Sequence, residues 1–119
     1  MTFRPYPVFD QYYSCPTGHD SPDHPTDLDN RTWTCRTCQQ RVHITVADKA
    51  GNHFIVERCP ASEIRPGDFL IYREKAGVTA GQVTASNPYQ GKGQRWHMAV
   101  EGFGSDRIAP EQFVNRIPG

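Results

Sequence analysis

The sequence predicts a mostly β protein with little or no α-helix. β-branched and aromatic side chains, which suit a pleated and half-buried surface, are abundant, whereas leucine occurs only at Leu28 and Leu70. Chains this poor in leucine rarely build helical bundles. Ten glycines and ten prolines interrupt almost every segment, which favours short strands joined by turns.

The first half of the chain predicts an aromatic arm, a polar loop and one hairpin. Two prolines in the arm exclude a central strand, so the arm is expected to be extended or an edge strand. Val42, Ile44 and Val46 alternate with polar residues, as in a half-buried strand. The predicted segments are the arm at 1–14, the loop at 20–31, and a hairpin of 41–47 and 53–58 with its turn at 48–52.

The second half predicts several short strands with glycine-rich corners. The strands are expected at 69–74, 80–86 and 95–102, with a connector at 60–68 and a long loop at 86–94. Gly102, Gly104 and Asp106 predict a further turn, and Ile108 the start of a short strand. The predicted core of this half is Phe69, Ile71, Val83, Met98, Val100, Ile108, Val114 and Ile117.

Charge and hydropathy narrow the classes of function. Thirteen basic and thirteen acidic residues give a formal net charge of zero, which argues against a strongly basic nucleic-acid surface. No stretch approaches the roughly 20 apolar residues of a membrane span. The segment Met1–Asp10 has no apolar centre of the kind found in secretory signals. We therefore expect a cytoplasmic protein without a membrane partner.

Four cysteines suggest how so polar a small domain is held together. Only 36% of the residues are hydrophobic, and small β domains with little core usually need disulfides or a bound metal for stability. Cys15-x3-His19 and Cys35-x2-Cys38 are two close pairs with the spacing of tetrahedral zinc ligands. Without a secretory signal, a metal is favoured over disulfides. A closed site with four protein ligands leaves no position for water, so the predicted zinc is structural.

Other assignments of these residues stay open. Cys59 could replace His19 to give four thiolates, and His24 or His43 could also take its place. The alternative without metal is four reduced cysteines packed as small apolar residues. A redox role for the CxxC pair is disfavoured because no βαβ pattern surrounds it.

The cysteine-containing region resembles a known zinc ribbon. Cys15-Pro16-x-x-His19, an acidic loop and Trp33-x-Cys35-x2-Cys38 are similar to the ribbon of actinobacterial RNA-polymerase-binding proteins of the RbpA type. The likeness covers about residues 12–46 and implies Cys15, His19, Cys35 and Cys38 as ligands. The resemblance does not imply the same binding partner, because the basic linker and the helical sigma-binding segment of that family are absent from this sequence.

The second half resembles an SH3-like barrel. The turn Pro66-Gly67-Asp68 before a strand and the ending Pro110-x-x-Phe113-Val114-x-x-Ile117 are both similar to that fold. The aromatic segment of peptide-binding SH3 domains is missing, so the resemblance does not imply binding of proline-rich peptides. The predicted division is a zinc ribbon with its aromatic arm at 1–60 and a small barrel at 61–119.

Three functions follow as hypotheses. The first is a non-enzymatic zinc-binding adaptor that docks on a protein or nucleoprotein machine, a transcription-related one being an option. The second is direct binding of nucleic acid, because aromatic side chains beside cations can hold phosphates and bases. The third is a small enzyme. Its candidate catalytic pairs are a thiol and an imidazole, Cys59 with His43 or His53, and an acid and a base, Asp68 with His97. No catalytic motif favours this hypothesis, and no small-molecule substrate is expected. The candidate contact residues are Tyr89, Lys92 and Arg95 in loop 86–96, with Arg36 and Arg41 beside the CxxC pair.

Overall fold

The prediction of a mostly β protein is confirmed by the computed structural model. It describes residues 3–5, 9–15, 28–29, 31–36, 39–74, 77–89, 91 and 93–118. In this part of the chain the helical residues are Phe9 and a 3₁₀ turn at Ala61–Glu63, both of the 3₁₀ type, and there is no α-helix. The strands are β1 (Asp10–Ser14), β2 (Leu28–Asp29), β3 (Thr34–Cys35), β4 (His43–Ala47), β5 (His53–Pro60), β6 (Phe69–Glu74), β7 (Gly77–Pro88), β8 (Trp96–Val100), β9 (Gly104–Ile108) and β10 (Phe113–Arg116).

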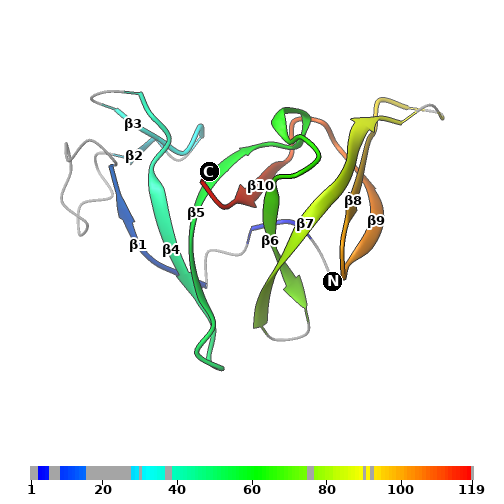
Figure 1. The fold of residues 1–119 in the computed structure, drawn as a ribbon. Coiled ribbons are helices and arrows are strands. Elements are labelled where there is room, and N and C mark those ends of the chain that lie inside the picture. Colours follow the sequence, from blue (N-terminus) through cyan, green and yellow to red (C-terminus); the bar gives the residue numbers. More distant parts are fainter. Residues whose placement is uncertain are drawn as a thin grey trace.

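Eight of these strands form one antiparallel sheet in the order β1-β4-β5-β10-β6-β7-β8-β9. The last strand of the chain, β10, lies in the middle of the sheet, between β5 and β6. Figure 1 shows β1, β4 and β5 on one side of β10 and β6 to β9 on the other. The short strands β2 and β3 pair only with each other and form a separate hairpin.

The central strands bury residues on both faces. Successive side chains of a strand point to opposite faces, and on β6 Leu70 packs in one core whereas Ile71 packs in the other. The same division separates Cys59 from Val56 on β5. The C-terminal core comprises Phe3, Cys59, Ala61, Ile64, Leu70, Tyr72, Val83, Met98, Val100, Ile108 and Val114. The N-terminal core comprises Cys15, Cys35, Val42, Ile44, Val46, Val56, Ile71 and Val78.

The two predicted units share both cores. Phe3, from the aromatic arm, stacks on Phe103 with ring centroids 4.0 Å apart, deep in the C-terminal core. In return, Ile71 and Val78 of the second half complete the N-terminal core. A division at residue 60 stays a prediction, and the sheet itself is continuous across it through the pairing of β5 with β10.

Six of the eight predicted core residues of the second half are buried, and Ile117 is half-buried. The prediction for Phe69 is wrong, because its side chain is 46% exposed. Phe69 is the first residue of β6 and lies opposite the exposed Gln82, outside both cores. The predicted turn at 102–106 is also wrong in part, since β9 already begins at Gly104 and ends at Ile108.

One surface carboxylate ties the β4–β5 hairpin to β7. Asp48 Oδ1 accepts hydrogen bonds from the backbone N–H groups of Ala50 and Asn52, each at 3.0 Å. Its Oδ2 accepts one from the backbone N–H of Val78, also at 3.0 Å. A Cβ atom on Gly77 would lie 2.6 Å from this oxygen, so the approach requires glycine. The hydrogen bond from Val78, followed by that from the Asn52 side chain, lowers the pKa of Asp48 below its ordinary value of 3.8.

The charge of Asp48 is expected to make stability depend on acidity. A lowered pKa in the folded state means that the contribution is complete above the unfolded pKa and is lost as pH falls through the folded value. Asp48→Asn should therefore lower the urea midpoint at pH 7, and the difference from wild type should shrink as the pH falls below 3.8. Urea unfolding followed by tryptophan fluorescence over this pH range measures it. Glu111→Gln removes an exposed carboxylate and is the control. If the difference between Asp48→Asn and wild type did not change with pH, the charge of Asp48 would not be the source of the stabilisation.

No helix in the described ranges has the length and apolar character needed to cross a membrane.

Candidate functional site

The predicted zinc knuckle around Cys35 lies on a tight reversal of the chain. Cys35 is the last residue of β3, and its N–H donates to the carbonyl oxygen of Gln40 at 2.8 Å. The Gln39 N–H in turn donates to the carbonyl oxygen of Cys35 at 2.7 Å. Gln39 has a φ of 62°, a left-handed conformation that few non-glycine residues adopt. Beyond the turn, Arg41 pairs with Thr34 in an isolated bridge. Cys35 and Gln39 thus lie at the two ends of a tight turn, which is the kind of backbone on which a metal knuckle is built.

Two of the four predicted ligands are described, and they lie in the same core. Cys15 follows β1, Cys35 ends β3, and both pack in the N-terminal core. His19 and Cys38 lie outside the described residues. Within the ranges that the structure describes, no three His, Cys, Asp or Glu side chains are grouped to hold a metal. Two buried thiols in one cluster suit the chemistry of a zinc site, and the full ligand set remains a prediction.

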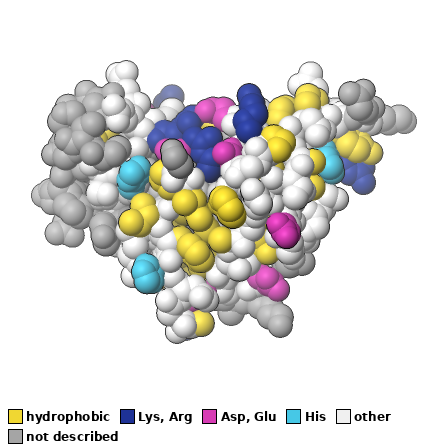
Figure 2. Space-filling view, in the orientation of Figure 1, with side chains coloured by type: hydrophobic (Ala, Val, Ile, Leu, Met, Phe, Trp, Pro, Cys, Tyr) yellow, Lys and Arg dark blue, Asp and Glu magenta, His cyan; other side chains and the backbone are white. Residues whose placement is uncertain are grey.

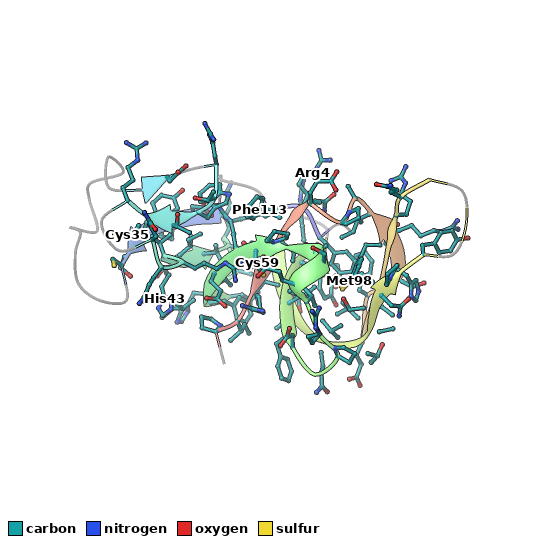
Figure 3. All side chains as sticks on the ribbon, turned by 90° about the horizontal axis from the view of Figure 1, so that it is seen from above. Arg4, Cys35, His43, Cys59, Met98 and Phe113 are labelled. Carbon is teal, nitrogen blue, oxygen red and sulfur yellow. The ribbon has the colours of Figure 1, made fainter. Side chains whose placement is uncertain are left out.

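The alternative ligands lie elsewhere or outside the described residues. Cys59 packs in the C-terminal core, on the other face of the sheet from Cys15 and Cys35. Figure 3 shows Cys35 at one end of the molecule and Cys59 near its middle. His43 neighbours Ile44 on β4, so its side chain points away from the N-terminal core that Ile44 enters. His24 is outside the described residues.

A buried ion pair joins β5 to β1, next to the predicted ribbon. Arg58 on β5 and Asp10 on β1 are 0% and 3% exposed, and two hydrogen bonds of 2.6 and 3.0 Å join the guanidinium to the carboxylate. Arg58 Nε also donates to Asn115 Oδ1 on β10 at 2.8 Å. The hydroxyl of Tyr13 donates to Asp10 Oδ2 at 2.7 Å. Every polar atom of the pair therefore has a partner, which is what burial of charge requires.

Trp33 connects this ion pair to the predicted knuckle. Its ring lies over Arg58, with the guanidinium carbon 4.2 Å from the ring centroid. Trp33 has a φ of 58°, which is unfavourable for so bulky a side chain. Hydrogen bonds hold it there, from its own N–H to the Asp29 carbonyl oxygen and from the Val42 N–H to its carbonyl oxygen. The cation–π contact thus links the chain just before Cys35 to the centre of the sheet.

The tyrosine in this cluster stays protonated over an unusually wide pH range. Burial, the hydrogen bond to Asp10 and the negative charge of Asp10 together raise the pKa of Tyr13 to about 12. The hydroxyl therefore remains a donor to Asp10 at neutral and mildly alkaline pH. It thereby satisfies one hydrogen-bonding position of the buried carboxylate.

The predicted contact loop contains a second cluster that the sequence only partly revealed. Tyr89 and Arg95 are joined by a hydrogen bond from the Tyr89 N–H to the Arg95 carbonyl oxygen at 2.9 Å. Arg107, on β9, donates to the Tyr89 hydroxyl at 3.0 Å and stacks on its ring. Lys92 lies outside the described residues. Arg107 was not predicted as a contact residue, because β9 carries no alternating hydrophobic pattern. The pairing of Arg107 with His97 of β8 brings it next to the loop that contains Tyr89.

The two arginines predicted beside the knuckle differ in their surroundings. Arg41 forms an ion pair of 2.6 Å with Glu63, so its charge is already compensated. Arg36 is exposed. Figure 2 shows basic and acidic side chains directly beside each other over the middle of one face, in keeping with ion pairs such as Arg116–Glu57. Of the two, Arg36 is the more available for a partner.

The residues proposed for an enzyme show no catalytic arrangement. Burial raises the pKa of Cys59 to about 11, so the thiol is protonated at neutral pH. The charges that act on it are those of two arginines and two glutamates, Arg116, Arg41, Glu63 and Glu57. Asp68 and His97 lie against different parts of β7, at Val83 and Asn87. These observations lend the enzyme hypothesis no support.

Removal of one partner of the Arg58–Asp10 pair is expected to be costly. Arg58→Met leaves the Asp10 carboxylate buried without its cation, which costs about 3–5 kcal/mol in comparable pairs. The double variant Arg58→Met with Asp10→Leu should recover much of that loss, because no unpaired charge remains. Urea unfolding of wild type, both single variants and the double variant measures the coupling. Additive effects of the two substitutions would show that the pair does not act as a unit.

Comparison with known proteins adds no identification. Neither the models of protein families, nor the curated proteins, nor the solved structures gave a match to this chain. The resemblances to a zinc ribbon and to an SH3-like barrel therefore rest on the residues quoted for them. The function has to be argued from the geometry of the described residues.

Proposed function

We propose that the protein is a non-enzymatic zinc-binding adaptor that docks on a protein or nucleoprotein machine. The observation that carries the proposal is the meeting of Cys15 and Cys35, from distant parts of the chain, as buried side chains of one core. Cys35 begins a tight reversal in which the next ligand, Cys38, would follow. His19 and Cys38 would complete a closed tetrahedral site.

In this proposal the metal is a structural element. Bound zinc would clamp the segment after β1 to the hairpin tip after β3, and its binding energy would add to the folding energy of a chain with little apolar core. The contact between Trp33 and Arg58 holds the hairpin against the sheet. Arg36, beside the predicted knuckle, is exposed. A rigid, exposed tip of this kind suits contact with a partner.

The strand order of the second half supports a contact module of the SH3-like type. The succession β10-β6-β7-β8-β9 is the order that such a barrel has when its last strand returns beside its first. A turn closed by a hydrogen bond from the Gln112 N–H to the Ala109 carbonyl oxygen precedes β10. We infer that this half serves as a second small platform. The pairing of β10 with β5 joins it rigidly to the ribbon side.

Metal analysis tests the zinc assignment. Purified protein is expected to contain one zinc per chain, and Cys15→Ser, Cys35→Ser, Cys38→Ser and His19→Ala should each lose it. Cys59→Ser is the matched control and should retain the metal, because Cys59 packs in the other core. The measurement is elemental analysis together with thermal unfolding before and after chelation. Metal-free protein that is folded and insensitive to a chelator would refute the assignment.

Affinity capture tests the docking function. Immobilised wild-type protein should retain one defined partner from extracts of its own organism, and the purified partner should bind directly. Arg36→Glu should weaken this binding at least tenfold, because reversal of one exposed charge at a contact costs about 1.4 kcal/mol or more. Cys59→Ser should bind as wild type does. Equal binding by the Arg36→Glu variant would place the contact surface away from the ribbon.

A further inference from the structure

The eight-stranded sheet ends at β9, and in the described part of the chain no strand pairs with its outer side (Figure 1). β9 pairs with β8 over five consecutive residue pairs without a shift in register. The strand at the opposite end of the sheet, β1, has an irregularity between Asp10 and Tyr12, and bulges of this kind hinder pairing with a further strand. β9 is therefore the regular edge of the sheet, which is where another strand can be added.

The outer side of β9 is open to solvent. Two open hollows border the strand, and Asp106 and Arg107 line both of them. The first four of its five residues, Gly104 to Arg107, are exposed. A second strand would therefore meet accessible residues along most of this edge.

One hydrogen bond identifies the backbone groups that face outward. The N–H of Arg107 donates to Oδ1 of Asp106 at 2.8 Å, so it is not donated to β8. In an antiparallel pair only alternate residues exchange backbone hydrogen bonds with the neighbouring strand. Ser105, two residues before Arg107, therefore also directs its N–H and C=O outward, whereas the backbone of Asp106 faces Met98 on β8.

Asp106 closes this edge in two ways. Its carboxylate occupies the outward N–H of Arg107, which an added strand would need. Its charge also opposes the pairing of two copies of β9. If two such strands pair antiparallel about a two-fold axis so that Ser105 and Arg107 exchange hydrogen bonds, the two Asp106 side chains lie opposite each other. Like charges in that position destabilise the pairing of strands.

The surroundings of β9 favour a second copy over a foreign peptide as the added strand. Domains that add a foreign strand select it with pockets for alternate side chains. The hollows here are lined mostly by charged and polar residues, with Arg95, Asp106 and Arg107 in both. A two-fold axis, by contrast, repeats every backbone contact and so compensates for a strand of only five residues.

We propose that the outer edge of β9 is a self-association surface that Asp106 keeps closed, and that the partner it fits is β9 of a second copy of this chain. Exchange of the outward N–H and C=O groups of Ser105 and Arg107 would join two eight-stranded sheets into one. The contact of Asp106 with the Arg107 N–H is then autoinhibitory. The proposal goes beyond the adaptor function and does not depend on zinc.

Analytical ultracentrifugation of the full chain over a range of protein concentrations tests the proposal. Wild-type protein should sediment as a monomer. Asp106→Ala should dimerise, with an association constant roughly 10- to 100-fold above that of wild type, because two N–H groups are freed and the like-charge contact is removed. Asp106→Lys should stay monomeric, since two lysines would then oppose each other. Glu101→Ala, which removes an exposed carboxylate just before β9, is the matched control and should also be monomeric.

A proline at position 105 shows whether the dimer uses this edge. Ser105→Pro removes an outward N–H and no hydrogen bond to β8, so the double variant Asp106→Ala/Ser105→Pro should return to monomer. Circular dichroism checks that each variant is folded. Amide hydrogen exchange of Asp106→Ala gives the same information without a second substitution. The N–H groups of Ser105 and Arg107 should be protected only at concentrations at which the dimer forms.

Several results would each overturn the proposal. A dimeric wild type would show that Asp106 does not close the edge, and a monomeric Asp106→Ala would show that it is not what prevents pairing. Dimers of Asp106→Lys or of Glu101→Ala would exclude pairing about Asp106. A dimer of the folded double variant, or one in which the amides of Ser105 and Arg107 exchange as fast as in the monomer, would place the contact elsewhere.

Discussion

The buried pair of Arg58 and Asp10 is the interaction on which the rest of the structure depends. Arg58 sits on β5 in the sheet, and its hydrogen bonds reach the edge strand through Asp10 and the central strand β10 through Asn115. The ring of Trp33 covers its guanidinium from the hairpin side. One side chain on β5 thereby contacts three other segments of the chain. Because the pair is nearly inaccessible to water, its geometry is fixed by the cost of leaving either charge unpaired.

This constraint matters because the sheet has two modest cores in place of one large one. Alternate residues of β5 and β6 divide between its faces, so each core receives only part of the apolar side chains of these strands. A chain with 36% hydrophobic residues then has little apolar area to bury in either core. The N-terminal core contains Cys15 and Cys35, where a metal would add the stability that apolar burial cannot supply. The ion pair, together with the zinc site if it forms as proposed, would thus stabilise the half of the sheet that contains the N-terminal core.

Much of the local structure could be predicted from the sequence, because local patterns decide it. The alternation of Val42, Ile44 and Val46 identified β4, and all three side chains are buried as expected. The segment 69–74 is a strand with the predicted bounds. The position of β10 between β5 and β6 had no local signal, since it joins residues about as far apart as 58 and 115. The burial of Phe3 in the C-terminal core is long-range in the same way.

The error at β9 and the failure to predict Arg107 have one physical origin. Four of the five residues of β9 are exposed, so its sequence carries no hydrophobic alternation and its glycine reads as a turn. Backbone pairing with β8 alone makes it a strand, and that pairing sets Arg107 beside the loop that carries Tyr89 and Arg95. Charged residues on an edge strand also discourage pairing with other chains. The same exposure that hides the strand from sequence analysis therefore leaves Arg107 on the surface, where it contacts Tyr89 of the neighbouring loop.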